Sequence, residues 1–416
     1  MATVYWDLTS RCDGVCAYCS AGARGARRAQ ARGGEPADGT PASAASAEIA
    51  ASASRPPGEI PPRLVPEVFR RLRAGGATGV VLLGGEPTLA PALQAALDAA
   101  GREGMTVGIA TNGLAHSQRL RESWLGRAGL SVNFSIDSFF PHENDAVRGS
   151  GAHAKAWRNL SALLAARKST NGLPRVTVQM TLTRVNLARL EDSARRIAES
   201  GVDAILLERM RVFPWHGDEV RALAPGPREW IDGAARLARA ATRVWRGPGK
   251  EALHASEGSF GHPAIVLNYG NALLKAALAK ELGYPGSIGR SCPGGFHSAV
   301  MNEAGGLHPC RLAAARLPPK KDDGSSWYEK QRLSILERGG EGFLDSPYFT
   351  RFFRFAHSAR VYERLALCRE CPHYANCEPC PMDVMAGGDR VLSECREILA
   401  GGIRWDANPG NALSLP

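Results

Sequence analysis

The sequence predicts an α/β protein: a partial (β/α)6 barrel of the TIM type followed by a small cysteine-rich domain. Between residues 64 and 210, apolar runs of strand length alternate with helical patterns, and short connections join them. This alternation is typical of a parallel sheet covered by helices. The ten cysteines all lie outside it, before residue 20 and after residue 290.

The barrel is expected to contain six strands, with a helix before each of the last five. The strands are expected at residues 3–9, 79–83, 106–110, 130–136, 175–182 and 204–208. The helices are expected at residues 65–74, 91–103, 117–128, 152–167 and 187–200. In such a barrel, the carboxyl ends of the strands and the loops after them form the site.

The domain organisation follows from changes in composition. The barrel is expected over residues 1–210, with a low-complexity insertion at 21–62, where 29 of 42 residues are Ala, Gly, Pro or Ser. Such a segment has too few large apolar side chains to pack, which predicts a loop or disordered insertion. A lid or a partner-binding arm is the alternative. The remaining parts are a bridging helical region at 211–290 (helical patterns at 228–245 and 272–282), the cysteine-rich domain at 291–400 and a tail at 401–416.

Composition excludes several classes of protein. No run of 18 apolar residues exists among the 416, and Cys12 comes too early for a secretory signal peptide, so we expect a cytoplasmic protein without membrane contact. Lys and Arg exceed Asp and Glu by ten, but they form no dense stripe and accompany no nucleic-acid motif. A solvated basic surface is favoured over an acidic partner. Without export, disulfides are not expected, and the cysteines point to metal.

The first cysteine cluster has the spacing C-x3-C-x2-C and directly follows the first expected strand. Three thiolates on one loop can hold three irons of a [4Fe–4S] cluster and leave the fourth iron open for a ligand. A structural zinc site completed by a remote fourth residue is the alternative.

Polar motifs are expected where the next strands end: Gly-Gly-Glu-Pro at 84–87, Thr-Asn-Gly at 111–113 and Ser-Ile-Asp-Ser at 135–138. They converge with the cysteine loop on the carboxyl edge of the sheet. Each motif is weak alone, since the first could be a turn and Asp137 a helix cap.

Together, the cysteine spacing, the aromatic Tyr18 before the third cysteine and the Gly-Gly-Glu-Pro motif resemble the radical S-adenosylmethionine (radical SAM) superfamily over residues 1–210. The resemblance implies a catalytic [4Fe–4S] cluster on Cys12, Cys16 and Cys19 that binds S-adenosylmethionine. One electron then cleaves this cofactor to a 5′-deoxyadenosyl radical, which abstracts a substrate hydrogen atom. The cofactor-binding residues that it implies are Tyr18, Gly84, Gly85, Glu86, Pro87, Asn112, Ser135, Asp137 and Arg148.

Within that set, the resemblance places Gly84, Gly85 and Glu86 at the methionine amino group. Arg148 could pair with the methionine carboxylate, because arginine binds carboxylates through two hydrogen bonds; an ordinary surface arginine is the alternative. Ser135 and Asp137 would face the ribose or methionine end. A structural role is favoured for Thr183 and Asn186.

The seven remaining cysteines resemble the SPASM extension of radical SAM enzymes, which holds two auxiliary [4Fe–4S] clusters, over residues 291–400. A zinc module would be favoured in isolation, but seven cysteines do not divide into zinc tetrads. By motif position, one cluster would use Cys368, Cys371, Cys377 and Cys395, and the other Cys292, Cys310 and Cys380. Only two residues separate Cys377 from Cys380, where the family usually has three. His297, His308, a substrate or water could complete the second ligand set.

The resemblance implies an oxidoreductase for oxidative modification, by crosslinking or dehydrogenation, of a ribosomally made peptide or a protein side chain, as in natural product biosynthesis. Action on a small molecule or tetrapyrrole in cofactor or antibiotic biosynthesis is the second hypothesis, and a non-catalytic metal-binding scaffold is the third. An electron donor such as flavodoxin or ferredoxin is implied. Arg311 stands where sulfatase-maturing relatives use Asp, so formylglycine formation is disfavoured.

Only 11 residues precede Cys12, so we expect a separate leader-peptide-binding protein, a leaderless substrate or a small molecule. Glu208 is the candidate catalytic residue, as a proton acceptor at the end of the sixth strand. A salt bridge to a neighbouring arginine is the alternative for Glu208. Other candidate substrate-facing residues are Arg209, Arg211, His254, His262 and Tyr269.

Overall fold

A computed structural model describes a large part of the chain. The described residues are 2–19, 58–210, 212, 216–245, 265–268 (backbone only), 278, 281–282, 298–310, 333–336, 342–350, 366–371, 395–397 and 399–400.

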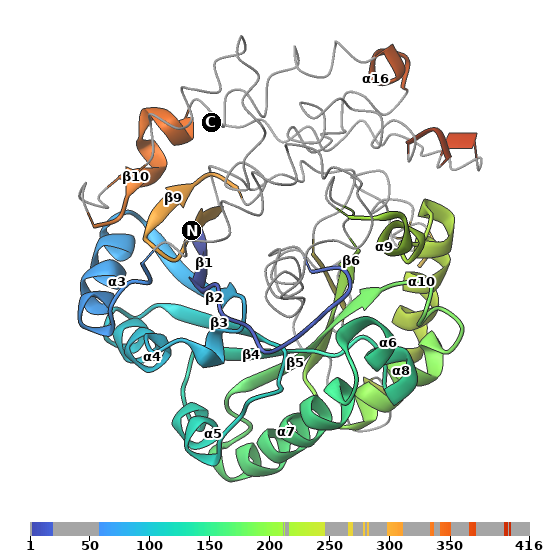
Figure 1. The fold of residues 1–416 in the computed structure, drawn as a ribbon, viewed down its shortest axis with the longest axis horizontal. Coiled ribbons are helices and arrows are strands. Elements are labelled where there is room, and N and C mark those ends of the chain that lie inside the picture. Colours follow the sequence, from blue (N-terminus) through green and yellow to red (C-terminus); the bar gives the residue numbers. More distant parts are fainter. Residues whose placement is uncertain are drawn as a thin grey trace, which may run out of the picture.

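Six parallel strands form the predicted partial barrel and pair in chain order. They are β1 (Ala2–Thr9), β2 (Ala77–Gly84), β3 (Thr106–Thr111), β4 (Leu130–Ser135), β5 (Arg175–Leu182) and β6 (Ala204–Arg209). In Figure 1 these strands follow an arc, and the helices lie on its outer side. The predicted fold class is confirmed, and β5 has the predicted bounds.

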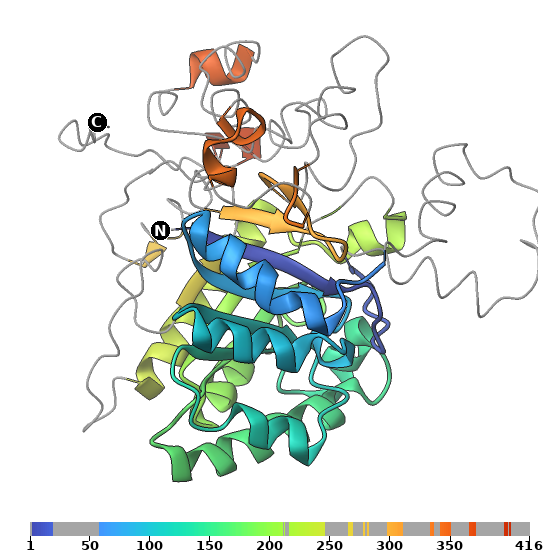
Figure 2. The same cartoon turned by 90° about the vertical axis from the view of Figure 1, so that its left-hand side faces the viewer.

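The outer helices follow the predicted order: α3 (Val65–Ala74), α4 (Leu93–Arg102), α5 (Gln118–Trp124), α7 (Ala152–Ala166) and α8 (Leu190–Glu199). Figure 2 shows them one after another along the outside, from blue α3 to green α7. The buried residues of β1 alternate with half-buried ones, so Val4, Trp6 and Leu8 face the helices. Trp6 packs against Phe69 of α3, with ring centroids 6.1 Å apart.

The sheet extends beyond the six predicted strands at both edges. Strand β7 (Ile265–Asn268) pairs in parallel with β6, and β8 (Ser298–Met301) pairs in parallel with β1. Strands β9 (Gly306–His308) and β10 (Leu333–Ser334) continue in antiparallel fashion. The sequence prediction missed these strands because runs of two to four residues are too short to show a periodic pattern.

Helix α6 (Pro141–Arg148) was also missed, because its sequence is mostly polar. Pro141 occupies its first turn, where a missing N–H costs nothing, and Gly149 ends it with a φ of 103°. The remaining described helices are α9 (Asp218–Ala222), α10 (Pro227–Trp245), α16 (Ala366–Glu370) and the 3-10 turns η1 (Pro62–Leu64), η2 (Pro87–Leu89), η3 (Arg167–Thr170) and η4 (Phe343–Asp345). Helix α10 contains the helical pattern expected at 228–245.

Most of the predicted insertion lies outside the described residues, as do most of the helical pattern at 272–282 and the whole tail. The insertion's last residues are described and pack on the protein. Ile60 is buried, and its N–H donates to the carbonyl of Glu303 at 3.0 Å. Glu59 forms an ion pair of 2.9 Å with Arg11 of the cysteine loop.

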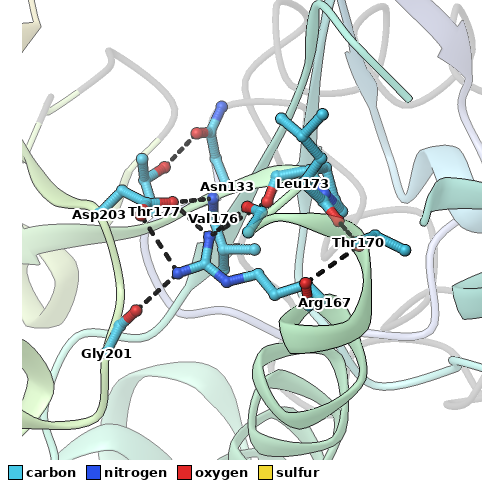
Figure 3. A network of polar contacts seen from close by, with 10 residues as sticks. Asn133, Arg167, Thr170, Leu173, Val176, Thr177, Gly201 and Asp203 are labelled. Atoms are coloured by element: carbon cyan, nitrogen blue, oxygen red, sulfur yellow. Dashed lines mark hydrogen bonds and ion pairs between the residues drawn. The ribbon is translucent and has the colours of Figure 1, made fainter. Parts of the chain in front are cut away.

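A polar network fastens the amino-terminal edge of the sheet, opposite the cysteine loop (Figure 3). The buried guanidinium of Arg167 donates from Nη2 to the carbonyl of Gly201 at 2.7 Å and to Oδ1 of Asp203 at 3.1 Å. Oδ2 of Asp203 accepts from the N–H of Val176 at 2.6 Å. The network therefore ties the starts of β5 and β6 to the end of α7.

Candidate functional site

The three predicted ligands of the first cluster lie on the loop directly after β1. Sγ of Cys12 accepts from the N–H of Gly14 at 3.3 Å. A Cβ atom built on Gly14 would lie 3.5 Å from that sulfur and 3.9 Å from Sγ of Cys16, so both sulfurs face one space. Burial raises the pKa of the Cys16 thiol, while Arg148 opposes that rise. The other two thiols raise it further, which places all three cysteines within electrostatic reach.

The donor set, three thiolates on one loop, fits three irons of a [4Fe–4S] cluster. In the described part of the chain, no group of three His, Cys, Asp or Glu side chains is arranged to hold one metal ion. Thiolates around a single zinc lie within about 4 Å of each other, because each Zn–S bond is about 2.3 Å. The thiolates of a cubane bind different irons and stand further apart.

The Gly-Gly-Glu-Pro segment packs directly against the cysteine loop. The N–H groups of Gly85 and Glu86 donate to the carbonyls of Thr9 and Arg11, each at 2.7 Å. A Cβ atom on Gly85 would lie 2.2 Å from the carbonyl oxygen of Arg11. Gly84 has a φ of 119°, and a Cβ atom there would lie 2.4 Å from the carbonyl oxygen of Thr9. Both glycines are therefore required by the close approach of two backbones.

The carboxylate of Glu86 is buried and joins the ends of β2 and β3. Its Oε1 accepts from the hydroxyls of Thr88 and Thr111, each at 2.7 Å, and Oε2 accepts from the N–H of Asn112 at 2.7 Å. Burial raises the pKa of Glu86, and these hydrogen bonds oppose the rise. Pro87 is buried at the start of η2. The carboxylate contacts protein donors, and its contact with a methionine amino group stays a prediction.

Asn112 brings the end of β3 to the cysteine loop. Its side-chain Oδ1 accepts from the N–H of Leu114 at 2.9 Å, which fixes the orientation of the amide. Its Nδ2 donates to Oδ1 of Asp13 at 2.7 Å and to Sγ of Cys12 at 3.8 Å. The predicted cofactor residue therefore lies beside a predicted cluster ligand.

Asp137, at the end of β4, is fully buried. Its carboxylate accepts hydrogen bonds from the cysteine loop, from β5 and from α6. Nη2 of Arg148 donates to Oδ1 at 2.8 Å, and Nε of Arg148 forms an ion pair with Oδ2 at 2.8 Å. The hydroxyl of Tyr18 donates to Oδ2. Oδ1 also accepts from the N–H of Thr181 at 2.8 Å. Burial raises the pKa of Tyr18 well above its usual value, so its phenol stays protonated. Arg148 is therefore a buried partner of Asp137 and not the ordinary surface arginine that was the alternative.

A small hollow lies between the cysteine loop and these strand ends. Its lining includes Gly14, Cys16, Asn112, Ser135 and Arg148. Four of the predicted cluster and cofactor residues, at 16, 112, 135 and 148, thus surround one space.

Glu208 lies half-buried on β6, where Oε1 accepts from Nε2 of Gln179 at 3.3 Å. Its role as a proton acceptor stays a prediction. Asn186 has the structural role expected of it, because Nδ2 donates to the carbonyls of Asp137 at 2.8 Å and Thr181 at 2.9 Å. Oδ1 of Asn186 accepts from the N–H of Thr183 at 3.0 Å.

Four of the seven later cysteines are described, at 310, 368, 371 and 395. Burial raises the pKa of Cys368, and the nearby Cys371 raises it further. Nδ1 of His308 lies 3.2 Å from the hydroxyl of Tyr348. The other predicted residues lie outside the described part: Arg211, His254, His262, Tyr269, Cys292, His297, Arg311, Cys377 and Cys380.

Sequence reasoning missed several residues that build the site. Thr88 and Thr111 hold Glu86, and Oδ1 of Asn144 accepts from the N–H of Asp137 at 3.0 Å. Thr111 belongs to the Thr-Asn-Gly motif expected at the strand end, but only Asn112 of that motif was among the predicted site residues. His116 contacts Thr111 across a turn of the chain, and no spacing rule indicates it.

Comparison with known proteins places this site in a family. Residues 6–197 match the model of the Radical SAM superfamily. The mycofactocin maturase MftC of Mycobacterium ulcerans (strain Agy99) is 26% identical over 189 residues. That match covers 45% of this chain and 42% of the relative, so less than half of the relative's length is matched.

Two solved structures share the fold over nearly the whole chain. SuiB of Streptococcus suis, bound to the precursor peptide SuiA, has a TM-score of 0.58 at 12% identity. The match covers 92% of this chain and 72% of the SuiB chain. Native anSMEcpe, with bound AdoMet and the Cp18Cys peptide, has a TM-score of 0.57 at 12% identity and covers 96% of both chains. The likeness includes the cysteine-containing carboxyl-terminal part. Among the described helices, none is both long and apolar enough to cross a membrane.

Proposed function

We propose that this protein is a radical SAM enzyme that oxidatively modifies a ribosomally made peptide or a protein side chain. The observation that carries the proposal is the hollow at the carboxyl edge of the sheet, where Cys16, Asn112, Ser135 and Arg148 surround one space beside the cysteine loop. A peptide substrate is proposed because SuiB and anSMEcpe, which share the fold, bind peptides. MftC, a maturase, resembles part of the chain.

Cys12, Cys16 and Cys19 would hold the catalytic [4Fe–4S] cluster, and the hollow beside them would receive S-adenosylmethionine. Together these groups would supply hydrogen-atom abstraction through one-electron chemistry. An electron donor such as flavodoxin or ferredoxin would work with them in the cytoplasm.

The protein residues would orient these groups and exclude water. Glu86 fixes the ends of β2 and β3, so the backbone carbonyls of Gly84 and Gly85 are the groups proposed to meet the methionine amino group. Asp137 holds Tyr18 and Arg148 in place through buried hydrogen bonds, which limits their movement on cofactor binding. Glu208 would accept the proton that an oxidised substrate releases, with Gln179 orienting its carboxylate.

The carboxyl-terminal cysteines are proposed to hold two auxiliary [4Fe–4S] clusters. One would use Cys368, Cys371, Cys377 and Cys395, and the other Cys292, Cys310 and Cys380. Clusters held by these cysteines would supply one-electron redox chemistry, which suits oxidative modification of a substrate. The proposed domains are the barrel at 1–210, the bridge at 211–290 and the auxiliary-cluster domain at 291–400.

Iron and sulfide content of the anaerobically reconstituted protein tests the proposal. We expect about twelve irons in the wild type and about eight in a C12A/C16A/C19A variant, which should also lose cleavage of S-adenosylmethionine. A C368A/C371A variant is the control, because it should lose auxiliary irons but keep the iron of the first cluster. Zinc in place of iron at the first site would overturn the proposal. Full iron content without modification of any peptide would overturn the peptide assignment.

A further inference from the structure

We propose that Thr111 and His116 are positioning residues that fix Asn112 as a hydrogen-bond donor to Cys12, and that they thereby set the reduction potential of the cluster bound there. This inference rests on the proposed function, because it requires a [4Fe–4S] cluster on Cys12, Cys16 and Cys19. Thr111 belongs to the Thr-Asn-Gly motif at 111–113, but neither Thr111 nor His116 was among the predicted site residues.

A continuous chain of hydrogen bonds runs from His116 to the cysteine loop. Oγ1 of Thr111 donates to Oε1 of Glu86 at 2.7 Å and accepts from the N–H of Gly113 at 3.0 Å. Nε2 of His116 lies 3.1 Å from the same hydroxyl. A hydroxyl has one proton, which Glu86 receives, so His116 must donate through Nε2.

Aromatic rings pack around His116, and its contact with Thr111 is the hydrogen bond that its ring makes among the described residues. Trp124 packs edge-on at 5.0 Å between ring centroids, and Phe134 lies at 5.2 Å. Nδ1 is buried and has no hydrogen-bond partner among the described residues. With the proton on Nε2, Nδ1 is the unprotonated nitrogen, and the Thr111 hydroxyl is the ring's hydrogen-bond partner in the described structure.

Glu86, which accepts from Thr111, also fixes the backbone of Asn112. Its other oxygen accepts from the backbone N–H of Asn112 at 2.7 Å, which fixes the peptide that follows Thr111. With Oδ1 already accepting from Leu114, Nδ2 is directed at Asp13 and at Sγ of Cys12.

A hydrogen bond to a cluster thiolate stabilises the reduced state more than the oxidised state, because the reduced cluster carries one more negative charge. Removing the donor should therefore lower the reduction potential. The N–H of Gly14 also donates to Cys12, at 3.3 Å, and side-chain substitutions leave that backbone donor in place. The expected effect is therefore partial.

The test is an EPR-monitored redox titration of the reconstituted full-length protein. The variants are T111V, which keeps the shape but removes the hydroxyl, H116F, which keeps the ring packing, and N112L. T111S is the conservative variant that keeps the hydroxyl. T177V is the matched control, because it removes a buried hydroxyl from β5 that bonds to Asn133 and is not connected to Asn112.

We expect T111V and N112L to shift the midpoint potential to more negative values, with the reduced-to-oxidised ratio at a fixed solution potential falling about threefold. H116F should shift it in the same direction by less, while T111S and T177V should match the wild type. Equal potentials in T111V, N112L and wild type would overturn the inference, as would an equal shift in T177V. Absence of the cluster from the wild type would instead refute the proposed function, so the two failures are distinguishable.

Discussion

Arg148 and Asp137 form a two-point ion pair at the mouth of the barrel, with Nε and Nη2 each 2.8 Å from a carboxylate oxygen. Burial alone would lower the pKa of Arg148, but Asp137 outweighs burial and raises it, so the guanidinium stays charged. Tyr18 donates to the same carboxylate. One buried charge pair therefore connects the cysteine loop, β4 and α6.

Replacing Asp137 by Asn should lower the free energy of unfolding by about 3–5 kcal/mol, because it leaves the buried charge of Arg148 without its partner. The measurement is urea denaturation of the reconstituted protein under anaerobic conditions. Arg195→Ala is the control, because Arg195 pairs with Asp192 and Glu199 on the exposed face of α8, and such pairs contribute about 1 kcal/mol or less. Similar losses in the two variants would contradict a special role for Asp137.

Gly85→Ala should displace the cysteine loop, because its Cβ atom would lie 2.2 Å from the carbonyl oxygen of Arg11. We expect the reconstituted variant to lose the four irons of the first site, as measured by iron content. Gly101→Ala on α4 is the matched substitution, since a Cβ atom there meets nothing within 4 Å. It should raise stability by about 0.5–1 kcal/mol. Normal iron loading of the Gly85 variant would show that the loop adapts.

Arg167→Ala should lower the free energy of unfolding by about 3 kcal/mol, because it leaves Asp203 and the carbonyl of Gly201 without their buried donor. The iron content of the folded variant should equal that of the wild type, since Arg167 lies at the opposite edge of the sheet. Arg228→Ala, which removes an exposed ion pair with Asp232, serves as the comparison in the same denaturation series. If the fully folded Arg167→Ala protein bound less iron than the wild type, Arg167 would affect the cluster site as well as stability, which would contradict the prediction.

The buried side chain of His116 should make the free energy of unfolding depend on pH. Burial lowers its pKa from 6.5 to about 4, so the unfolded chain binds a proton at this residue below pH 6.5 and the folded chain does not. Its contribution to stability is therefore present above pH 6.5 and lost as the pH falls toward 4, with about 1.6 kcal/mol lost between pH 6.5 and 5.

Urea denaturation of wild type and H116F at pH 5, 6 and 7.5 checks this prediction. Both proteins keep His153, whose pKa burial also lowers, so the difference between them isolates His116. We expect the wild type to lose about 2 kcal/mol more than H116F between pH 7.5 and 5. Parallel losses would show that His116 takes up its proton equally in the folded and unfolded states.

Much of the barrel could be predicted because its signals are local. The bounds of α3 and β5 were predicted to the residue, since apolar periodicity and turn residues mark them. Strands β7 and β8 were missed because they depend on pairing with β6 and β1 and not on their own pattern. The same reasoning identified the strand-end motifs, because polar groups at the carboxyl ends of parallel strands must converge.

The sequence by itself determined the superfamily, the cysteine loop and the residues at the strand ends, because spacing and order along the chain encode them. Only the tertiary structure decided their partners. Arg148 and Asp137 are eleven residues apart and face each other because α6 folds back over the end of β4. His116, Thr111 and Glu86 meet because neighbouring strands end at the same edge. Hydrogen bonds between elements depend on distances in space, and those distances are set only when the sheet and its helices pack together.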